Sequence, residues 1–375
     1  MKYIYLLLTS VLLLQACTDD GFPVPPASTV PSFTYTIDNE EFAPATVTFT
    51  NTSIVPETVG TAIYYWNFGD GESSSEKNPT YVYSESGVYT VNLVVTTSES
   101  LEIMESSKAI VIKDPNATGT PIYYIDGAQV YQGLINTQAP IFTPVSGIAA
   151  QSSYGMVMDT LNLKLYISDY GADKIYRANL DGSNFEDFRT GVDSPNGMTI
   201  DYQENQIYFD TSNGILRADL DVTDLSQKED FVTGQPNDPD GLSIDVQNRK
   251  LYWINYDGGV WSKNLDGTGE MEIIPNLLGG GSILVIGNRI YYDDYIASGD
   301  IRLKSANLDG TGVTTIAVGI TRVVYGLAYE PDEQKIYWGN RGNDAMMRAN
   351  LDGSNTEVWY QATSDTRGIV IGKKM

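Results

Sequence analysis

The feature that most constrains this chain is a repeat that runs through its last two thirds. A Tyr flanked by apolar or aromatic residues recurs with steps of 43, 42, 44, 39 and 46 residues, at Tyr123, Tyr166, Tyr208, Tyr252, Tyr291 and Tyr337. A second motif, Asn-Leu-Asp-Gly, recurs at 179–182, 264–267, 307–310 and 350–353. A period near 42 residues with several short strands per unit is typical of β-propeller blades.

A third motif orders the strands within each unit. An apolar strand follows Gly155, Gly197, Gly241, Ser282, Gly326 and Gly368. We assign this strand to the innermost position, the Tyr strand to the second, and the strand that ends at Asn-Leu-Asp-Gly to the third, before an outer fourth strand. Six inner and six second strands predict six blades. The repeat starts at a second strand, Ile122, and ends at an inner strand, 368–371, so the C-terminal strand should complete the first blade and leave no open sheet edge.

These motifs resemble a known propeller family. The closest copies are Leu165–Asp169 with Ile175–Gly182, and Ile336–Asn340 with Arg348–Gly353. They resemble the six-bladed YWTD propeller of the low-density-lipoprotein-receptor family over residues 119–375, and NHL-type and lactonase-type propellers are alternatives with the same layout. No unit has a complete Tyr-Trp-Thr-Asp. The third blade has residues 221–224 in place of the Asp-Gly turn, which predicts a longer loop there.

A different pattern occupies residues 31–113, where polar and apolar residues alternate as in half-buried strands. The run Trp66-Asn-Phe-Gly-Asp-Gly71, followed by Gly87-Val-Tyr-Thr-Val91, resembles a PKD domain, a small Ig-like β-sandwich. The resemblance implies buried Trp66 and Phe68 and a turn in which glycine supplies positive φ. We interpret Asp70 as a turn-capping residue. The predicted fold is therefore all-β, a sandwich that acts as a spacer and then a six-bladed propeller.

The N-terminus has the features of a secretory signal. Lys2 precedes an apolar run, Ile4–Leu14, that is too short for a bilayer, which needs ~20 residues. Leu14-Gln-Ala-Cys17 resembles a bacterial lipobox, which implies cleavage after residue 16 and lipidation of Cys17, the only cysteine. The Asp19-Asp20 pair resembles signals for the outer-membrane surface, so we expect a surface-exposed outer-membrane lipoprotein of a Gram-negative bacterium. Residues 17–30 contain several prolines and predict a stiff tether.

Composition excludes several functions. The chain has 375 residues, no His, one Cys and a formal net charge of −25. Without His there is no imidazole base and no His-ligated metal site, and a single Cys allows no internal disulfide. The acidic balance repels phosphate backbones, so nucleic acid is not an expected partner.

Candidate binding residues lie in two sets of loops. Loops that enter inner strands and loops that join second to third strands should form one face of the propeller. Tyrosines that stack on sugar rings, with carboxylates and amides that bind hydroxyls, would suit a glycan, and the same face would suit a basic protein. The candidates are Tyr170, Tyr256, Tyr295, Tyr154, Tyr325, Arg341, Arg367 and Asp240.

Other polar residues are expected to be structural. Side chains that follow the Tyr strands belong to the repeat and should bind neighbouring backbone groups, at Asp169, Asn255, Asp294 and Asn340. Cations near the third strands should pair with carboxylates of their blades, at Arg177, Arg217, Lys263, Lys304 and Arg348.

We therefore expect a non-catalytic surface lipoprotein, without a cofactor, that binds an extracellular glycan or protein. Calcium is an open alternative, because carboxylates and amides supply the oxygen ligands that it takes. A metal-dependent lactonase or lyase is a second hypothesis, with Asn196, Asp240 and Asn255 as ligands. A third is an architectural envelope protein that contacts another membrane component.

Overall fold

The computed structural model describes residues 29–98, 103–115, 119–135, 140–221, 223–235 and 237–374. Cys17, the predicted lipidation site, lies outside them. The chain divides into two compact units, one built mostly from residues before 110 and one from residue 110 onward. Among the described residues no helix could cross a membrane. The helical elements there are three 3-10 turns, η1 (Asn39–Glu41), η2 (Glu57–Val59) and η3 (Arg341–Asn343).

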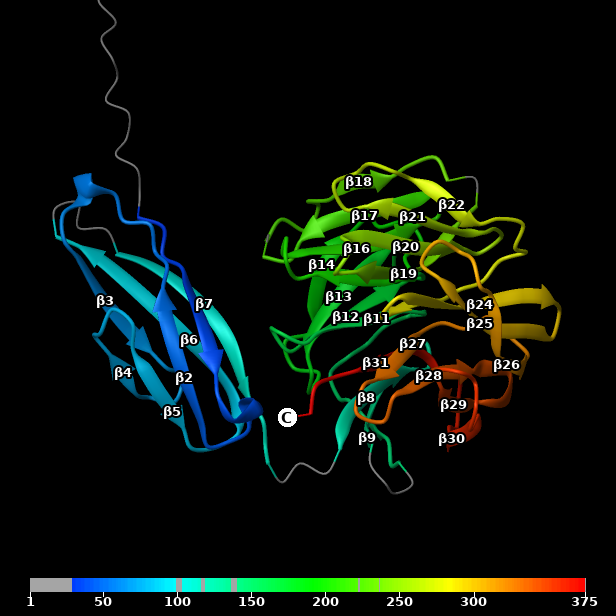
Figure 1. Ribbon diagram of the computed structural model, residues 1–375, viewed down its shortest axis with the longest axis horizontal. Coiled ribbons are helices and arrows are strands. Elements are labelled where there is room, and N and C mark those ends of the chain that lie inside the picture. The colour runs from blue at the N-terminus through cyan, green and yellow to red at the C-terminus, as the bar shows by residue number, and fades with distance from the viewer. Residues whose placement is uncertain are drawn as a thin grey trace, which may run out of the picture. The chain divides into compact units, whose positions relative to one another are not determined.

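The first unit is a two-sheet sandwich (Figure 1). One sheet has the order β1-β2-β5, with β1 Phe33–Ile37, β2 Ala45–Asn51 and β5 Thr80–Tyr83. The other has the order β4-β3-β6-β7, with β4 Ser73–Ser74, β3 Ala62–Asn67, β6 Gly87–Thr97 and β7 Ile103–Ile112.

Aromatic side chains fill the core of this sandwich, as the motif predicts. Trp66 and Phe68 are buried, and the rings of Phe33 and Trp66 lie 5.0 Å apart in an edge-to-face contact. Gly69 has φ +87°, and a Cβ there would meet the backbone of Thr90. Tyr81 lies 4.2 Å from the ring of Phe68.

Asp70 has the structural role expected from the sequence. One carboxylate oxygen accepts the Glu72 amide at 3.1 Å, which caps the turn. The other accepts the Tyr81 hydroxyl at 2.7 Å and ties the turn to β5.

The second unit is a ring of six four-stranded sheets, as predicted (Figure 1). Each sheet is antiparallel, and blades 2 to 6 run in chain order from the inner to the outer strand. The strands of blades 1 to 3 are β8 Thr120–Ile125, β9 Val130–Ile135, β10 Thr143–Pro144 and β31 Arg367–Ile371; β11 Met156–Asp159, β12 Lys164–Asp169, β13 Lys174–Asn179 and β14 Glu186–Thr190; and β15 Met198–Asp201, β16 Gln206–Thr211, β17 Gly214–Asp219 and β18 Glu229–Val232. Those of blades 4 to 6 are β19 Pro239–Asp245, β20 Lys250–Asn255, β21 Val260–Asn264 and β22 Met271–Ile274; β23 Ile283–Ile286, β24 Arg289–Ala297, β25 Asp300–Asn307 and β26 Thr314–Ile320; and β27 Leu327–Glu330, β28 Lys335–Asn340, β29 Ala345–Asn350 and β30 Glu357–Gln361.

The last strand closes the ring. β31 pairs antiparallel with β8, and Ile371 lies opposite Ile122. It supplies the inner strand that blade 1 otherwise lacks, so the first and last strands of the unit share one sheet. This is the predicted closure by the C-terminal strand, and it leaves no unpaired inner edge on blade 1.

The repeated Tyr is the contact between blades. Tyr166 of β12 is 2% exposed and packs in one cluster with Met198 and Ile207 of the next blade. Tyr337 of β28 likewise packs with Ile122 of blade 1, across the point of closure. Each blade therefore completes the core of its neighbour, which explains why the Tyr motif recurs once per unit.

The Asn-Leu-Asp-Gly motif is a turn on the loop between the third and fourth strands. In blade 2, Asp181 accepts the Ser183 amide at 2.9 Å while Gly182 has φ +84°. The same arrangement recurs at Asp266, Asp309 and Asp352. Blade 3 lacks the motif, and its connection from β17 to β18 is longer, as predicted.

The third-strand cations have the structural partners expected from the sequence. Arg177 pairs with Glu186 on the next strand, and Arg348 contacts both Glu333 and Glu357. Lys304 pairs with Asp294. These ion pairs lie within their blades and are part of the scaffold.

Candidate functional site

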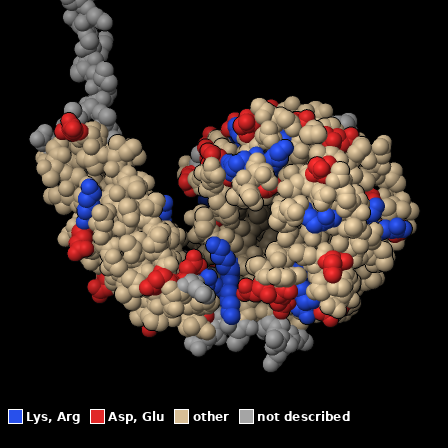
Figure 2. Space-filling model, viewed as in Figure 1, with Lys and Arg blue, Asp and Glu red and all other residues tan. Residues whose placement is uncertain are grey.

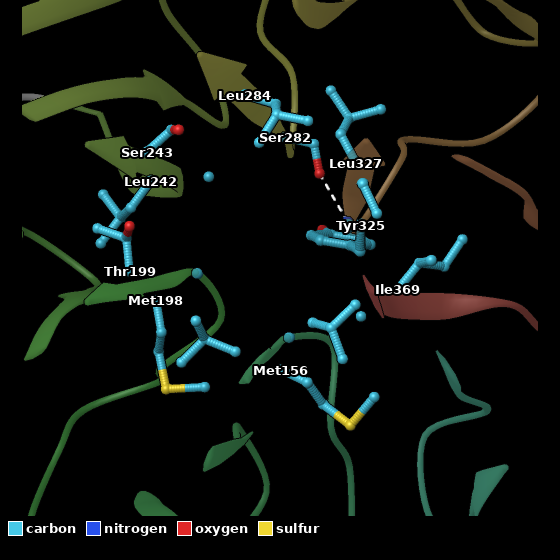
Figure 3. Close-up of a pocket in the computed structure, with 18 of the residues that line it drawn as sticks. Met156, Met198, Thr199, Leu242, Ser243, Ser282, Leu284, Tyr325, Leu327 and Ile369 are labelled. Atoms are coloured by element: carbon cyan, nitrogen blue, oxygen red, sulfur yellow. Dashed lines mark hydrogen bonds between the residues drawn. The ribbon is translucent and has the colours of Figure 1, made fainter. Parts of the chain in front are cut away.

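The six inner strands surround a cavity of about 260 Å³ on the axis of the ring. Apolar side chains from every blade line it, and Figure 3 shows Met156, Met198, Leu242, Leu327 and Ile369 around it. The space-filling view shows the propeller unit hollowed at its centre (Figure 2). Thr199, Ser243 and Ser282 also line the cavity (Figure 3), but no charged side chain of the described residues does. The charged groups that could recognise a polar ligand therefore lie outside the channel, at its end.

Glycine begins most inner strands because neighbouring blades approach closely there. A Cβ on Gly155 would collide with the backbone oxygen of Asn196, and one on Gly197 would collide with that of Asp240. The backbone of each blade therefore touches the next around the axis. This fixes the position of the residues that precede these glycines, among them Tyr154, Asn196 and Asp240.

Two of the predicted tyrosines meet at this end of the channel. The rings of Tyr154 and Tyr325 lie 4.8 Å apart, although they precede the inner strands of blades 2 and 6, and both line the cavity. Figure 3 shows Tyr325 among the inner-strand side chains. The Arg341 guanidinium lies 4.9 Å from the Tyr325 ring and the Arg367 guanidinium 4.4 Å from the Tyr154 ring. Stacked guanidinium and aromatic groups hold each other in place. We call Tyr154, Tyr325, Arg341, Arg367 and Asp240 the channel mouth.

The arginines of the channel mouth share one carboxylate. Arg367 donates to Asp365 at 2.6 Å and Arg341 at 3.4 Å. Burial opposes ionisation of Asp365, but the adjacent Arg367 and Arg341 outweigh it, so the pKa of that carboxyl is lowered. Burial lowers the pKa of Arg341, and the positive charge of Arg367 lowers it further.

Carboxylates and amides without partners lie on the other side of the mouth. Asp240 is 1% exposed, and neither of its side-chain oxygens has a partner of normal hydrogen-bond geometry among the described residues. The Tyr325 hydroxyl and the Asn196 side chain nevertheless lie close enough to act on its pKa as hydrogen-bond donors. Burial raises its pKa well above the usual value, and repulsion from Asp238 adds to this. Asn196 is also buried, and its side-chain oxygen lacks a partner. Buried acceptors of this kind are costly unless something donates to them.

The acidic group extends to Asp210 and Asp238. Asp210 accepts the Asn196 amide at 2.8 Å with one oxygen, and its other oxygen has no partner among the described residues. Burial and the charge of Asp240 raise its pKa. Burial, with Asp193 and Asp257 nearby, raises the pKa of Asp238 to about 6.

The other predicted tyrosines lie in different places. Tyr256 is 41% exposed, and its pKa is raised by burial and by Asp240, so it belongs beside the mouth. Tyr170 is 49% exposed and contacts the Tyr154 ring edge-to-face at 6.1 Å. Tyr295 instead lies within β24 and packs partly buried against the apolar cluster of blades 5 and 6. Four of the five tyrosines therefore surround the mouth, and Tyr295 does not join them.

Two of the four repeat-wide polar residues bind backbone groups as expected, namely Asp169 and Asn340. The other two bind side chains instead, since Asp294 pairs with Lys304 and Asn255 contacts Gln235. Asp169 accepts the amides of Gln151 and Ser152 at 2.6 and 3.0 Å and that of Gly171 at 3.0 Å. Asn255 donates to Gln235, and its side-chain oxygen lacks a partner among the described residues.

Sequence reasoning did not single out Asp210, Asp238 or Asp365. Asp210 occupies the position that Ser168 has in blade 2, because Phe209 and Ile167 pair equivalently with their inner strands. The sequence therefore contains one signal for Asp210, a carboxylate at a position where blade 2 has an uncharged serine. Asp365 gave none, since its role depends on arginines from three separate loops.

Among the described residues, no three His, Cys, Asp or Glu side chains are placed to hold a metal ion. A mixed set of Asp240, Asn196 and Asn255 would supply carboxylate and amide oxygens, all with at least one oxygen free. Such oxygens are the ligands of hard cations.

Two family models match the chain. Residues 29–112 match the PKD domain, and residues 156–273 match the SMP-30/Gluconolactonase/LRE-like region.

Collagenase ColA of Bacillus cereus is 51% identical over 55 residues, which is 15% of this chain and 6% of the collagenase. Protein cueball of Drosophila grimshawi is 28% identical over 170 residues, 42% of this chain and 27% of that protein. The vitellogenin receptor Yl of Drosophila melanogaster is 27% identical over 176 residues, which is 45% of this chain and 8% of the receptor. The chain thus spans well under two thirds of these relatives.

Solved structures resemble the chain in fold. A chain of the nidogen/laminin complex has a TM-score of 0.59 at 16% identity and covers 68% of this chain and 98% of its own length. TolB from Acinetobacter baumannii has a TM-score of 0.52 at 10% identity, with coverages of 76% and 80%. The chain contains a PKD domain followed by a β-propeller that includes an SMP-30/LRE-like region.

Proposed function

We propose that the chain binds an extracellular glycan or protein at the channel mouth and catalyses no reaction on it. The observation that carries this is the convergence of Tyr154 and Tyr325, backed by Arg341 and Arg367, beside the unpartnered oxygens of Asp240 at one end of the cavity. Aromatic faces, cations and acceptors around one opening are the groups that recognise a polar ligand with apolar faces.

A glycan is the favoured ligand. Sugars offer hydroxyl donors to Asp240 and Asn196, and their C–H faces pack on tyrosine rings. The structural likeness to a chain of the nidogen/laminin complex favours a protein ligand instead. That structure is a complex of nidogen with laminin, so a protein partner is tested alongside glycans.

The test is binding of the purified protein to a glycan array, together with a pull-down from the native membrane. Tyr170→Ala and Tyr256→Ala remove exposed tyrosines beside the mouth and should weaken the binding. Tyr65→Ala is the matched control, because Tyr65 is 50% exposed in the sandwich. Empty results in both assays contradict the proposal, as does binding that the two mouth variants leave unchanged.

We further propose that Cys17 is lipidated and holds the protein at the outer-membrane surface. The support is the position of the only cysteine, directly after Leu14-Gln-Ala16 and an apolar run. A lipid anchor and a tether would present the two folded units to extracellular ligands.

A metal-dependent lactonase is the second candidate function. The match of residues 156–273 to a region named for gluconolactonase favours it, and so do the unpartnered oxygens of Asp240, Asn196 and Asn255. These three residues would hold the cation, which would polarise the lactone carbonyl. Metal analysis and turnover of a lactone panel test it. A metal-free protein whose properties do not respond to a chelator rules it out.

A further inference from the structure

We infer that the ligand of the channel mouth is a carboxylated sugar, such as a uronic acid residue, with its carboxylate on the arginine side. This rests on the proposed function and names the ligand class of the same site.

Three arginines of the mouth and its edge share one acidic partner. Arg322, Arg341 and Arg367 lie within 3.4, 3.4 and 2.6 Å of Asp365, and none of them pairs with another carboxylate in the described part of the chain. One carboxylate balances one guanidinium, so two positive charges are left over at this point. The chain as a whole carries −25, which makes this local excess a specific feature.

The arginine group has donors to spare. Arg341 is 5% exposed, and its Nε has no hydrogen-bond partner among the described residues. Its Nη2 contact with Asp365 is long, at 3.4 Å. Arg322 is 52% exposed and can reach a ligand in solvent. A second carboxylate near Arg322 and Arg367 would offset the burial of cationic groups, since paired charges cost less than unpaired ones.

The opposite side of the ring is acidic. Arg341 and Arg367 lie on blades 6 and 1, whereas Asp210 and Asp240 lie at blades 3 and 4, which face them across a ring of six. Asp240 and Asn196 present buried oxygens that have no well-aligned donor in the part of the chain that the structure describes. The mouth is therefore polarised, with spare donors on one side and spare acceptors on the other.

A sugar acid matches each of these features at once. Its carboxylate pairs with the guanidinium groups, and its hydroxyls donate to Asp240 and Asn196. Its ring lies against Tyr154 and Tyr325, whose own rings are 4.8 Å apart. A neutral sugar leaves the arginine excess unbalanced. An acidic peptide side chain brings a carboxylate without a ring of hydroxyl donors.

The experiment compares ligands that differ only in charge. Oligomers of galacturonic acid, their methyl esters and neutral galactose oligomers are titrated into the purified protein by calorimetry. The acid form should bind at least about 3- to 10-fold more tightly than the ester, and the difference should shrink at high salt, as expected for a partly exposed charge pair. Arg322→Gln should remove the preference for the acid. Arg302→Gln is the matched control, because Arg302 is 41% exposed and pairs locally with Asp300.

Each outcome decides between the two proposals. Equal binding of acid, ester and neutral oligomers overturns the carboxylate inference and leaves glycan binding in place. Binding of an acidic peptide but no sugar overturns the inference and leaves a protein ligand. If none of the oligomers and no acidic peptide binds, and the pull-down recovers no partner, the proposed function itself is contradicted. An unchanged preference in Arg322→Gln, with a folded variant, also overturns the inference.

Discussion

The guanidinium of Arg367 lies 4.4 Å from the ring of Tyr154, and its Nη1 donates to the Ser153 backbone oxygen at 3.2 Å. Arg367 is the first residue of β31, the strand that completes blade 1. Tyr154 precedes the inner strand of blade 2. The strand that closes the ring therefore also supplies part of the channel mouth, so closure and ligand binding depend on the same few residues.

Removal of residues 367–375 should destabilise the propeller and abolish binding. It deletes β31, exposes the inner edge of blade 1 and takes away Ile369, which is 2% exposed. We expect a loss of at least about 2–5 kcal/mol, the usual cost of losing a large buried aliphatic side chain, and a tendency to aggregate. Thermal unfolding and light scattering measure this. Removal of 373–375 alone is the control, and an equal unfolding temperature for both truncations would contradict the closure role.

Tyr154→Ala and Tyr295→Ala should separate binding from packing. Tyr154 lines the cavity, so its loss should weaken ligand binding by about tenfold, the value of a stacking aromatic. Tyr295 packs on the cluster of blades 5 and 6, so its loss should lower the unfolding temperature and leave the affinity unchanged. Calorimetric titration and thermal unfolding of both variants check this. The reverse pattern would show that the sequence-based choice of Tyr295 was sound.

Asp238→Asn should stabilise the protein above pH 6 and have little effect near pH 3. Burial raises the folded-state pKa of Asp238 to about 6, above its unfolded value, so the group favours folding at low pH and loses that contribution as pH rises through 6. Asn carries no charge at any pH, so the variant does not lose this stability when the pH rises through 6. We expect a gain of about 1–2 kcal/mol at pH 8, less than the full shift because the side chain is only partly buried.

The control for this pH effect is Asp230→Asn, which removes an equal charge from an exposed position on β18. Chemical unfolding of the three proteins at pH 3, 6 and 8 separates the local effect from the change in net charge. A gain that is the same at every pH, or the same in both variants, would show that the environment of Asp238 is not its cause.

Cys17→Ser should release the protein from the membrane. If Cys17 carries the acyl chains, its loss leaves only a soluble head after signal cleavage. Metabolic labelling with a fatty-acid analogue and fractionation of the native cells measure this. Wild-type protein that is unlabelled, or a serine variant that still fractionates with the outer membrane, would contradict the lipid anchor.

The sequence predicts the fold because each blade repeats the same local solution. Tyr166, Tyr208 and Tyr252 occupy one register position and each packs on the following blade, so their spacing reports the size of the unit. Trp66 and Phe68 similarly mark the core of the sandwich. Local periodicity is enough for these features because neighbouring blades are also neighbours in sequence.

The channel mouth is harder to predict because it joins distant parts of the chain. Arg367 and Ser153 are 214 positions apart, yet they share a hydrogen bond. The repeat indicates which loops face the mouth, and the residues chosen on that basis lie near one another there: Tyr154, Tyr325, Arg341, Arg367 and Asp240. It does not indicate how deep a side chain lies, and so it predicts a loop position for Tyr295, whereas Tyr295 lies within β24 and packs against an apolar cluster.

The pairing of Ile371 with Ile122 has a consequence for the order of the blades along the chain. The two strands are hydrogen-bonded neighbours although about 250 positions separate them in the sequence. A short linker could therefore join them, and new termini could be opened in an exposed turn elsewhere in the ring. In three dimensions the ring has no first blade. Chains in which the blades follow in a circularly permuted order would form the same propeller.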